Sequence, residues 1–237
     1  MSLTNAAHST VAYSIRVSPR AKRARIEVSP LGQVKVIVPK RFNQDLIPAF
    51  IAQHENWILK TREKNRQQRP TQPERPDRCT FHAINEQWFI NYSVDTPVSM
   101  MQVDYDHKQI FFHPDANYQS GLRQWLHSHA RGHLIHLLRK KSCELALPFN
   151  KAFVKNQKTR WGSCSAKGNI NLNRNLLFLP GELVNYLLVH ELCHTVHLNH
   201  SPAYWRLVHS HLADYRLFDQ QLRQAQRFVP NWALPES

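Results

Sequence analysis

Five consecutive residues, His190-Glu191-Leu192-Cys193-His194, have the types and spacing that metal-dependent hydrolysis requires. Residues i and i+4 of a helix lie one above the other on one face, so both imidazoles can reach the same metal ion. Neutral imidazole nitrogen is a good ligand for zinc. Glu191 directly follows the first histidine, where its carboxylate can take a proton from water beside the metal. Chance would produce this pattern roughly 0.04 times in a chain of this composition, so we interpret it as a zinc site with Glu191 as general base.

A catalytic zinc site usually has three protein ligands and one open position, so a third ligand must come from outside this motif. His197 would share a helical face with the two motif histidines, but it lies about 10.5 Å from His190 along the helix axis. That separation leaves no tetrahedral arrangement for all three. Asn199 can end the helix and Pro202 can begin the next one, which places His200 at a corner near the metal. We therefore predict His200 as the third ligand, among the candidates His197, His200, His209, His211 and Asp214.

The motif lies in an apolar stretch that predicts a buried helix over about 182–198. Polar side chains in a buried helix need partners, and a metal ion would provide them. Upstream, residues 160–164 include Gly162, which would let a backbone approach closely, and a sheet edge there could hold an extended peptide. A packing role in support of the helix explains this segment equally well. We expect no nucleophilic role for Cys164, because metal-activated water makes one unnecessary.

Two segments, RWGSCSAKGNINLNRNLLFLP (residues 160–180) and VHELCHTVHLNHSPAYW (residues 189–205), resemble the YgjP-like family of predicted bacterial zinc metallopeptidases. That family is related to the SprT-like and WLM groups within the zincins. The resemblance is strongest over residues 118–215 and extends weakly to the N-terminal motifs RAKRARIEV and GQVKVIVP, whereas residues 64–78 and 113–120 are not matched. It implies a zincin-like α+β fold with a sheet edge beside the HExxH helix. It also implies that Glu191 is the catalytic base and that zinc is bound by His190, His194 and His200.

Hydrophobic periodicity predicts the elements that position this site. Strands are expected at residues 11–17, 26–28, 34–38, 88–92, 101–105, 109–112, 151–155, 159–165 and 170–173. Helices are expected at residues 44–66, 118–145, 182–198 and 201–227. The strands between residues 81 and 112 are expected to be antiparallel.

A polar segment with three prolines, residues 64–78, indicates a boundary within the chain. We predict a β-rich N-terminal module with one helix (1–66), a linker or loop (67–79) and a zincin-like catalytic domain (80–237). The predicted fold class is α+β, with the HExxH helix beside an antiparallel or mixed sheet.

The 237 residues are 42% hydrophobic, which predicts a globular protein and excludes a disordered chain. No run approaches the ~18 apolar residues of a membrane helix, so no membrane partner is expected. Residues 1–20 lack the apolar core of a signal peptide, and the expected location is the cytoplasm. The four cysteines have no CxxC spacing, so free thiols are expected.

The net charge of +14 predicts attraction to polyanions. Five cations and no acid lie within ten residues near the N-terminus: Arg16, Arg20, Lys22, Arg23 and Arg25. Together with residues 60–78, this stretch is a candidate surface for nucleic acid or nucleotides, although an inert basic surface explains the charge equally well. The sequence does not determine the oligomeric state.

These observations predict a zinc-dependent hydrolase, with a metallopeptidase acting on peptides or proteins as the favoured activity. The first alternative is a metal-dependent phosphohydrolase acting on nucleotides or nucleic acid, which the positive charge suits. The second is a nucleic-acid-associated module with structural zinc, but structural zinc sites are usually closed by four protein ligands. His129 and His133 form another i, i+4 pair; without an acid alongside, we expect a surface or packing role for them.

Overall fold

The computed structural model describes residues 11–29, 32–67, 75–97 and 101–234. The chain divides into two compact units, Met1–Thr71 and Gln72–Ser237. Much of the predicted linker, residues 68–74, lies outside the described residues, and the predicted domain bounds stay a prediction. None of the described helices has the length and apolar character needed to cross a membrane.

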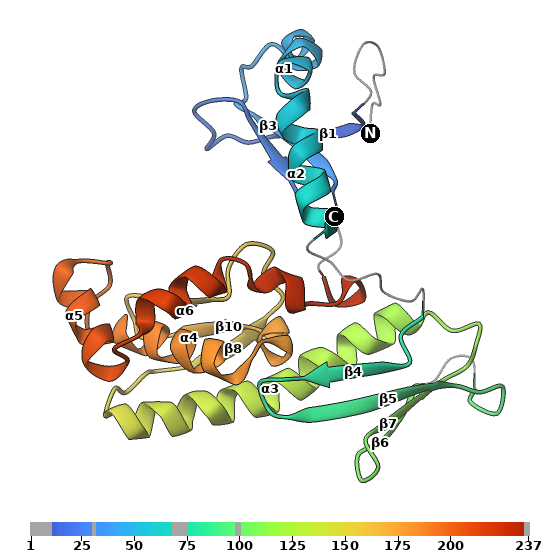
Figure 1. The fold of residues 1–237 in the computed structure, drawn as a ribbon, viewed down its shortest axis with the longest axis vertical. Helices are drawn as coiled ribbons and strands as arrows, with labels where there is room; N and C mark the ends of the chain where they lie inside the picture. Colours follow the sequence, from blue (N-terminus) through green and yellow to red (C-terminus); the bar gives the residue numbers. More distant parts are fainter. Residues whose placement is uncertain (1–10, 30–31, 68–74, 98–100, 235–237) are drawn as a thin grey trace. The chain divides into compact units, whose positions relative to one another are not determined.

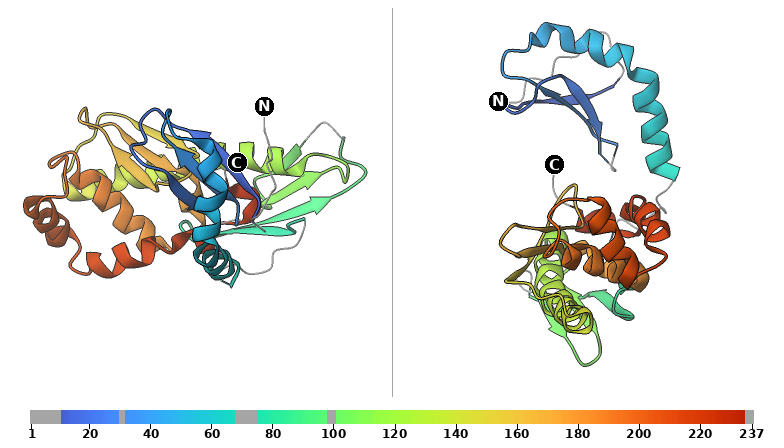
Figure 2. Two further views of the ribbon diagram at one scale, coloured as in Figure 1. Left: turned by 90° about the horizontal axis from the view of Figure 1, so that it is seen from above. Right: turned by 90° about the vertical axis from the view of Figure 1, so that its left-hand side faces the viewer.

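The N-terminal unit contains a three-stranded sheet in the order β1-β3-β2. Its strands are β1 (Tyr13–Val17), β2 (Arg25–Val28) and β3 (Val34–Val38). The central strand β3 pairs antiparallel with β2 and parallel with β1. One face of the sheet packs against helices whose buried residues are Ile47, Ile51 and Ile58. Figure 2 shows this unit from two directions. The sheet and helices therefore share one small apolar core.

The prediction of a single helix over residues 44–66 is wrong, because the structure has three helical segments there. A 3-10 turn η1 (Gln44–Leu46) precedes α1 (Ile47–Gln53), and α2 follows (Glu55–Gln67). Pro48 explains the start of α1, since proline lacks the N–H that the first helical turn leaves unpaired. The break falls at His54, whose backbone leaves the helical region and whose Nδ1 donates to the Phe50 carbonyl at 2.9 Å.

The second unit begins with a four-stranded sheet in the order β4-β5-β7-β6. The strands are β4 (Arg78–Phe81), β5 (Glu86–Tyr92), β6 (Met101–Asp104) and β7 (Gln109–Phe112). The prediction that these strands are all antiparallel is wrong, because β5 and β7 pair in parallel. The β6–β7 hairpin places β7, not β6, beside β5, so the sheet is mixed.

Helix α3 (Tyr118–Leu145) has the predicted bounds and is the longest element of this unit (Figure 1). Asn117 caps it by accepting a hydrogen bond from the Ser120 backbone N–H at 3.2 Å. Its buried side chains recur at helical spacing: Leu122, Trp125, Leu126, Ala130, Leu134 and Leu138. That apolar face packs against strand β8 (Ala152–Lys155), the 3-10 helix η2 (Arg174–Phe178) and helix α4 (Gly181–Cys193).

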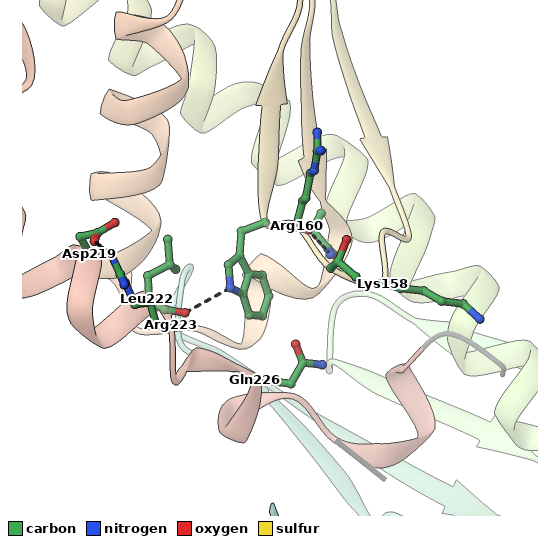
Figure 3. Close-up of a pocket in the computed structure, with 9 residues that line it drawn as sticks. Lys158, Arg160, Asp219, Leu222, Arg223 and Gln226 are labelled. Atoms are coloured by element: carbon green, nitrogen blue, oxygen red, sulfur yellow. Dashed lines mark hydrogen bonds and ion pairs between the residues drawn. The ribbon is translucent and has the colours of Figure 1, made fainter. Parts of the chain in front are cut away.

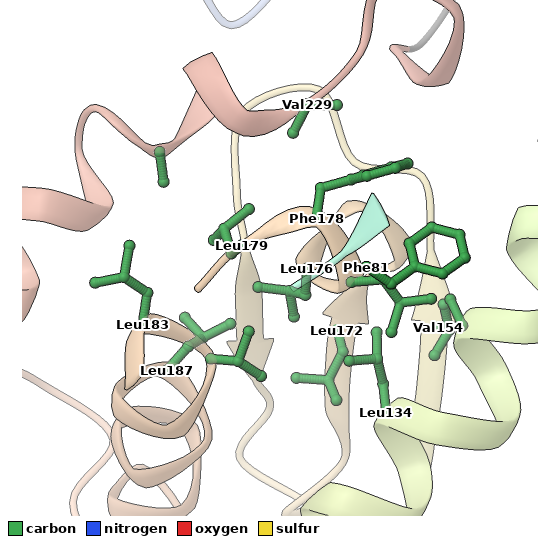
Figure 4. Packing of buried hydrophobic residues seen from close by; sticks show 14 of the residues in the cluster. Phe81, Leu134, Val154, Leu172, Leu176, Phe178, Leu179, Leu183, Leu187 and Val229 are labelled. Carbon is green, nitrogen blue, oxygen red and sulfur yellow. The ribbon is translucent and has the colours of Figure 1, made fainter. Parts of the chain in front are cut away.

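A second mixed sheet, in the order β8-β10-β9, lies beside the HExxH helix α4 (Gly181–Cys193). Its strands are β8 (Ala152–Lys155), β9 (Gly162–Cys164) and β10 (Ile170–Asn173). The edge strand β9 contacts α4. Figure 4 shows the core between these elements, where Leu172 and Leu176 lie near Leu183 and Leu187 of the helix. The predicted α+β fold with the HExxH helix beside a mixed sheet is therefore present.

The predicted end of the HExxH helix at residue 198 is wrong, because α4 ends at Cys193. Val196 and Leu198, which suggested continuation, are 54% and 61% exposed and do not enter the core. At the end of the helix, the Thr195 hydroxyl donates to the Leu192 carbonyl at 2.8 Å. The Thr195 backbone N–H donates to the same carbonyl at 2.9 Å, a bond of the tighter 3-10 type that is common where a helix ends.

The final helix predicted over residues 201–227 is also interrupted. The structure has α5 (Pro202–His211), α6 (Tyr215–Leu222) and two 3-10 turns, η3 (Ala225–Phe228) and η4 (Asn231–Ala233). Trp205 stacks on Tyr215 with ring centroids 5.1 Å apart. In an unbroken helix, positions ten residues apart would lie about 15 Å apart along the axis. Packing between the two helices therefore requires the break near Leu212.

Candidate metal centre

The structure brings three histidines together at the end of α4. His190 is in the last turn of the helix, His194 is its C-cap residue, and His200 lies just before α5. Their ligand atoms all lie within 4.8 Å of one another. The Nε2 atoms of His190 and His200 are 3.3 Å apart. Among the described residues, this group contains no carboxylate ligand.

Local hydrogen bonds orient His194 toward this group. Its Nδ1 lies 2.9 Å from the His197 carbonyl, which can only accept, so Nδ1 carries the proton and Nε2 has the free electron pair. The Tyr204 ring stacks on the His194 ring at 4.4 Å with an interplanar angle of 21°. The hydrogen bond and the stacked ring together hold the His194 imidazole in one orientation.

His190 is oriented by a hydrogen-bonded chain from α6. The Tyr186 hydroxyl donates to Asp219 Oδ1 at 3.0 Å, so it accepts from the His190 Nδ1–H, 3.4 Å away. This leaves the His190 Nε2 unprotonated and facing His200. The Tyr204 hydroxyl donates to the His190 carbonyl at 3.1 Å, which ties α5 to α4. An acceptor at Nδ1, here the Tyr186 hydroxyl, sets the tautomer and the orientation of a ligating imidazole.

His200 is positioned by the corner between α4 and α5. The Ser201 side chain caps α5 by accepting from the Tyr204 backbone N–H at 3.3 Å, and Pro202 is at the first helical position. The His200 ring stacks on Trp205 with centroids 5.3 Å apart. The next helix therefore begins immediately after the residue that faces His190 and His194.

Glu191 is almost fully buried, with 3% of its surface exposed, and its Oε2 atom has no hydrogen-bond partner. Burial raises the pKa of Glu191 to about 8, whereas the Arg160 guanidinium acts in the opposite direction. An unpartnered buried carboxylate is costly unless a cation or a proton donor lies nearby. Burial therefore makes the Glu191 carboxylate a stronger base than an exposed glutamate.

Two of the three histidines, His190 and His194, are in contrast held neutral by their surroundings. Burial lowers the pKa of His190 to about 3, and His194 and His200 contribute in the same direction. Burial also lowers the pKa of His194, against the effect of its bond to the His197 carbonyl. Neutral imidazoles offer an electron pair to a metal ion without first losing a proton.

The donor set fits a divalent metal ion. Two nitrogens bound to one tetrahedral zinc at the usual bond length of about 2.0–2.1 Å lie about 3.3–3.4 Å apart. The Nε2 atoms of His190 and His200 are 3.3 Å apart, and the unpartnered Glu191 carboxylate is on the same helix. Three imidazoles with a nearby carboxylate that makes no protein hydrogen bond at Oε2 are the composition expected of a catalytic rather than a structural zinc site.

Gly162 of β9 makes room for the Glu191 side chain. A Cβ atom added at Gly162 would lie 2.8 Å from both the Cγ and the Cδ of Glu191, closer than real Cβ contacts occur. The sequence left two roles open for this segment, the close approach of a peptide backbone and support of the motif helix. The structure shows that the open side of Gly162 is occupied by the catalytic-base candidate, so the glycine serves the helix that carries the motif.

We expect Gly162→Ala to reduce hydrolysis by about 100-fold, because a displacement of the reacting group by about 1 Å has effects of that size. Overpacking should also lower the free energy of unfolding by about 1–3 kcal/mol. Steady-state kinetics and denaturant unfolding measure the two effects. Gly181→Ala is the matched control, since an added Cβ there meets nothing within 4 Å. Equal activity of the two variants would show that Gly162 does not position Glu191.

A cavity of about 390 Å³ opens between the start of β9 and α6 (Figure 3). Lys158, Arg160 and Arg223 contribute positive charge to its lining, and Arg223 pairs with Asp219 at 2.8 Å. The Trp161 Nε1–H donates to the Leu222 carbonyl at 3.3 Å and closes one wall. Asp219 also accepts from the Tyr186 hydroxyl, which contacts His190. The lining of this cavity is therefore connected to the histidine group through Tyr186.

The other candidates for a third ligand lie outside this group in the described structure. His197 contributes its backbone carbonyl to His194. The His209 Nδ1 lies 3.2 Å from the Ala213 carbonyl. Neither these residues nor His211 and Asp214 join the histidine group. Cys193 is fully buried, and burial raises the pKa of Cys164 to about 11, which disfavours the thiolate.

Three residues that position the histidines were not predicted from the sequence: Tyr186, Tyr204 and Asp219. Tyr186 precedes His190 by four residues, so helical spacing could have placed it beside that imidazole. Tyr204 and Asp219 approach the site only because the chain turns after α4 and again after α5. No local signal in the sequence shows those two turns bringing them back to His190.

The fold and the histidine group define a metallohydrolase of the α+β zincin type. The chain belongs to the YgjP-like family, whose metallopeptidase-domain model matches residues 22–225. This match confirms the resemblance seen in the sequence and the predicted enzyme class.

Similar solved structures include two metallopeptidase zymogens. Abylysin of Pyrococcus abyssi is 26% identical, with a TM-score of 0.36, and the match covers 41% of this chain and 99% of that one. Jannalysin of Methanocaldococcus jannaschii is 18% identical, with a TM-score of 0.35, and the match covers 40% of this chain and 97% of that one. No curated protein matches this chain.

Proposed function

We propose that this protein is a zinc metallopeptidase in which His190, His194 and His200 bind the metal and Glu191 is the general base. The observation that carries the proposal is the group of three imidazoles together with a buried carboxylate whose Oε2 has no protein partner. When bound, zinc supplies Lewis acidity, which lowers the pKa of water and polarises a carbonyl group.

Glu191 has the proton-handling role in this proposal. Its carboxylate accepts a proton from the attacking water, holds it at an Oε atom, and delivers it to the leaving amine. In the metal-free protein, burial raises the pKa of Glu191 to about 8, which makes its carboxylate a stronger base than that of an exposed glutamate. Tyr186 and Asp219 keep His190 in the required tautomer throughout.

Peptide or protein substrates suit the surroundings of the site. Strand β9 is at the edge of its sheet and contacts α4, so an extended peptide can add to it as a further strand. The cationic cavity lined by Lys158, Arg160 and Arg223 adjoins the start of the same strand. We propose that this cavity receives an acidic or carboxylate group of the substrate.

The phosphohydrolase alternative is not favoured. The chain belongs to a metallopeptidase family, and the histidine group holds no carboxylate ligand of the kind common in two-metal phosphoryl chemistry. The five cations near the N-terminus are all exposed: Arg16, Arg20, Lys22, Arg23 and Arg25. Their proposed contact with nucleic acid stays a prediction, as does the cytoplasmic location.

A substrate panel tests the proposed function. The full chain loaded with Zn²⁺ is incubated with casein, a nucleoside triphosphate and single-stranded DNA, with and without a metal chelator. We expect new peptide N-termini from casein, loss of this cleavage on chelation, and its return when zinc is added. Release of phosphate or shortened DNA with intact casein would contradict the proposal.

A further inference from the structure

A second group of potential metal ligands lies in the C-terminal unit, away from the HExxH motif. It consists of Glu86 at the start of β5 and of His129 and His133 on α3, with ligand atoms all within 4.8 Å of one another. From the sequence, we expected a surface or packing role for the two histidines because no acid lay alongside. The structure supplies the acid from a strand 43 residues earlier in the chain. We propose that Glu86, His129 and His133 bind a second divalent metal ion.

The geometry of the two histidines repeats that of the HExxH helix. His129 and His133 are one turn apart on α3, and their ring centroids are 4.5 Å apart. The corresponding pair, His190 and His194, has centroids 4.9 Å apart. Glu86 Oε2 lies 3.2 Å from the His129 Nε2, so the carboxylate points at the pair rather than at solvent.

The candidate ligands are largely buried, and neighbouring aromatic side chains hold them in place. Only 6% of the His129 side chain and 18% of the Glu86 side chain are exposed. The His129 ring stacks on Trp125 at 5.1 Å and contacts Phe81 and Trp88. The Trp88 Nε1–H donates to Glu86 Oε2 at 3.0 Å. Ligating carboxylates are commonly hydrogen-bonded in this way. The second partner of that oxygen is the His129 Nε2 at 3.2 Å, and a metal ion would take the place of the proton between these two atoms.

The positive charge of Lys108 disfavours a metal ion at this site, because it lies beside the Glu86 carboxylate. Its Nζ lies 3.3 Å from Glu86 Oε1, the oxygen that does not face His129. Its side chain is 41% exposed, so it can swing into solvent when a metal binds. We therefore expect Lys108→Ala to bind the second ion more tightly, since removing a like charge favours a cation.

Two imidazoles and one carboxylate favour a borderline divalent ion such as Zn²⁺ or Co²⁺ over Ca²⁺ or Mg²⁺, which prefer oxygen ligands. Such an ion would connect β5 to α3 and so stabilise the packing of the four-stranded sheet on that helix. Its expected effect is on stability, because metal bound only by the folded state stabilises that state.

Metal content of the full chain tests the proposal. Apo-protein is loaded with excess Zn²⁺, freed of unbound metal, and analysed by mass spectrometry for zinc per chain. We expect two ions in the wild type, one in His133→Ala, one in Glu86→Gln, one in His194→Ala and none in the His133→Ala/His194→Ala double variant. His136→Ala is the matched control and should retain two, because His136 is exposed on the same helix and outside the group.

Folding does not obscure this result, because Glu86→Gln retains the acceptor for Trp88. Thermal unfolding of each apo-variant checks its integrity. Co²⁺ titration of His194→Ala gives an independent readout: one equivalent should produce visible d–d absorption that the double variant lacks. One ion in the wild type with none in His194→Ala, or two in a folded His133→Ala, would overturn the second site. Failure of the proposed active site would instead leave His133→Ala without metal.

Discussion

Glu191→Gln should abolish hydrolysis while the protein keeps its metal. Glutamine retains the size of glutamate but cannot accept a proton from water, and loss of a general base typically costs 10²–10⁴-fold in rate. Since Glu191 is not among the three grouped imidazoles, zinc content should not change. Peptide cleavage and zinc per chain, measured on the same preparation, decide the prediction. Full activity in this variant would remove Glu191 from its proposed role.

The same variant has a stability signature that does not depend on a substrate. In metal-free wild type, burial raises the pKa of Glu191 from 4.5 to about 8. The folded protein therefore binds this proton more tightly than the unfolded chain, and stability falls as pH rises from 4.5 to 8. Metal-free Glu191→Gln should lose this part of the pH dependence. It should be more stable than wild type at pH 7 and similar below pH 4.5, as denaturant unfolding at several pH values would show.

The parts of the site that could be predicted from the sequence are those set by local spacing. The i, i+4 relation of His190 and His194 follows from helix geometry, and the Ser201-Pro202 start of α5 follows from capping chemistry. Helix α3 has the predicted bounds because its buried apolar side chains keep helical spacing from Leu122 to Leu138, over about four turns.

The missed features depend on contacts between distant segments. Glu86 reaches His129 only through the pairing of β5 within its sheet and the packing of that sheet on α3. The break after α5 follows from the stacking of Trp205 on Tyr215, and nothing in residues 211–214 resembles a glycine or proline stop signal. Periodicity extended α4 to Leu198 because it cannot distinguish an apolar residue that enters the core from one that is exposed.

The second large effect concerns the third ligand: His200→Ala should lose the active-site metal and His197→Ala should keep it. We would measure both in a His133→Ala background, where only one ion is expected. The Nε2 of His200 lies 3.3 Å from that of His190, so its removal takes away a candidate ligand atom. His197 contributes only its backbone carbonyl, which alanine retains. Affinity should fall in His200→Ala by more than the ~10–100-fold typical of outer-shell changes.

The early end of α4 strengthens this assignment for a physical reason. A straight helix from His190 to His197 would separate the two Cα atoms by about 10.5 Å along its axis. Because the helix ends at Cys193, the backbone turns, and the His197 carbonyl accepts from the His194 Nδ1–H. That bond directs the Nε2 of His194 toward His200, and it survives His197→Ala because it uses the main chain. If His197→Ala lost zinc and His200→Ala retained it, the corner after α4 would not position the third ligand.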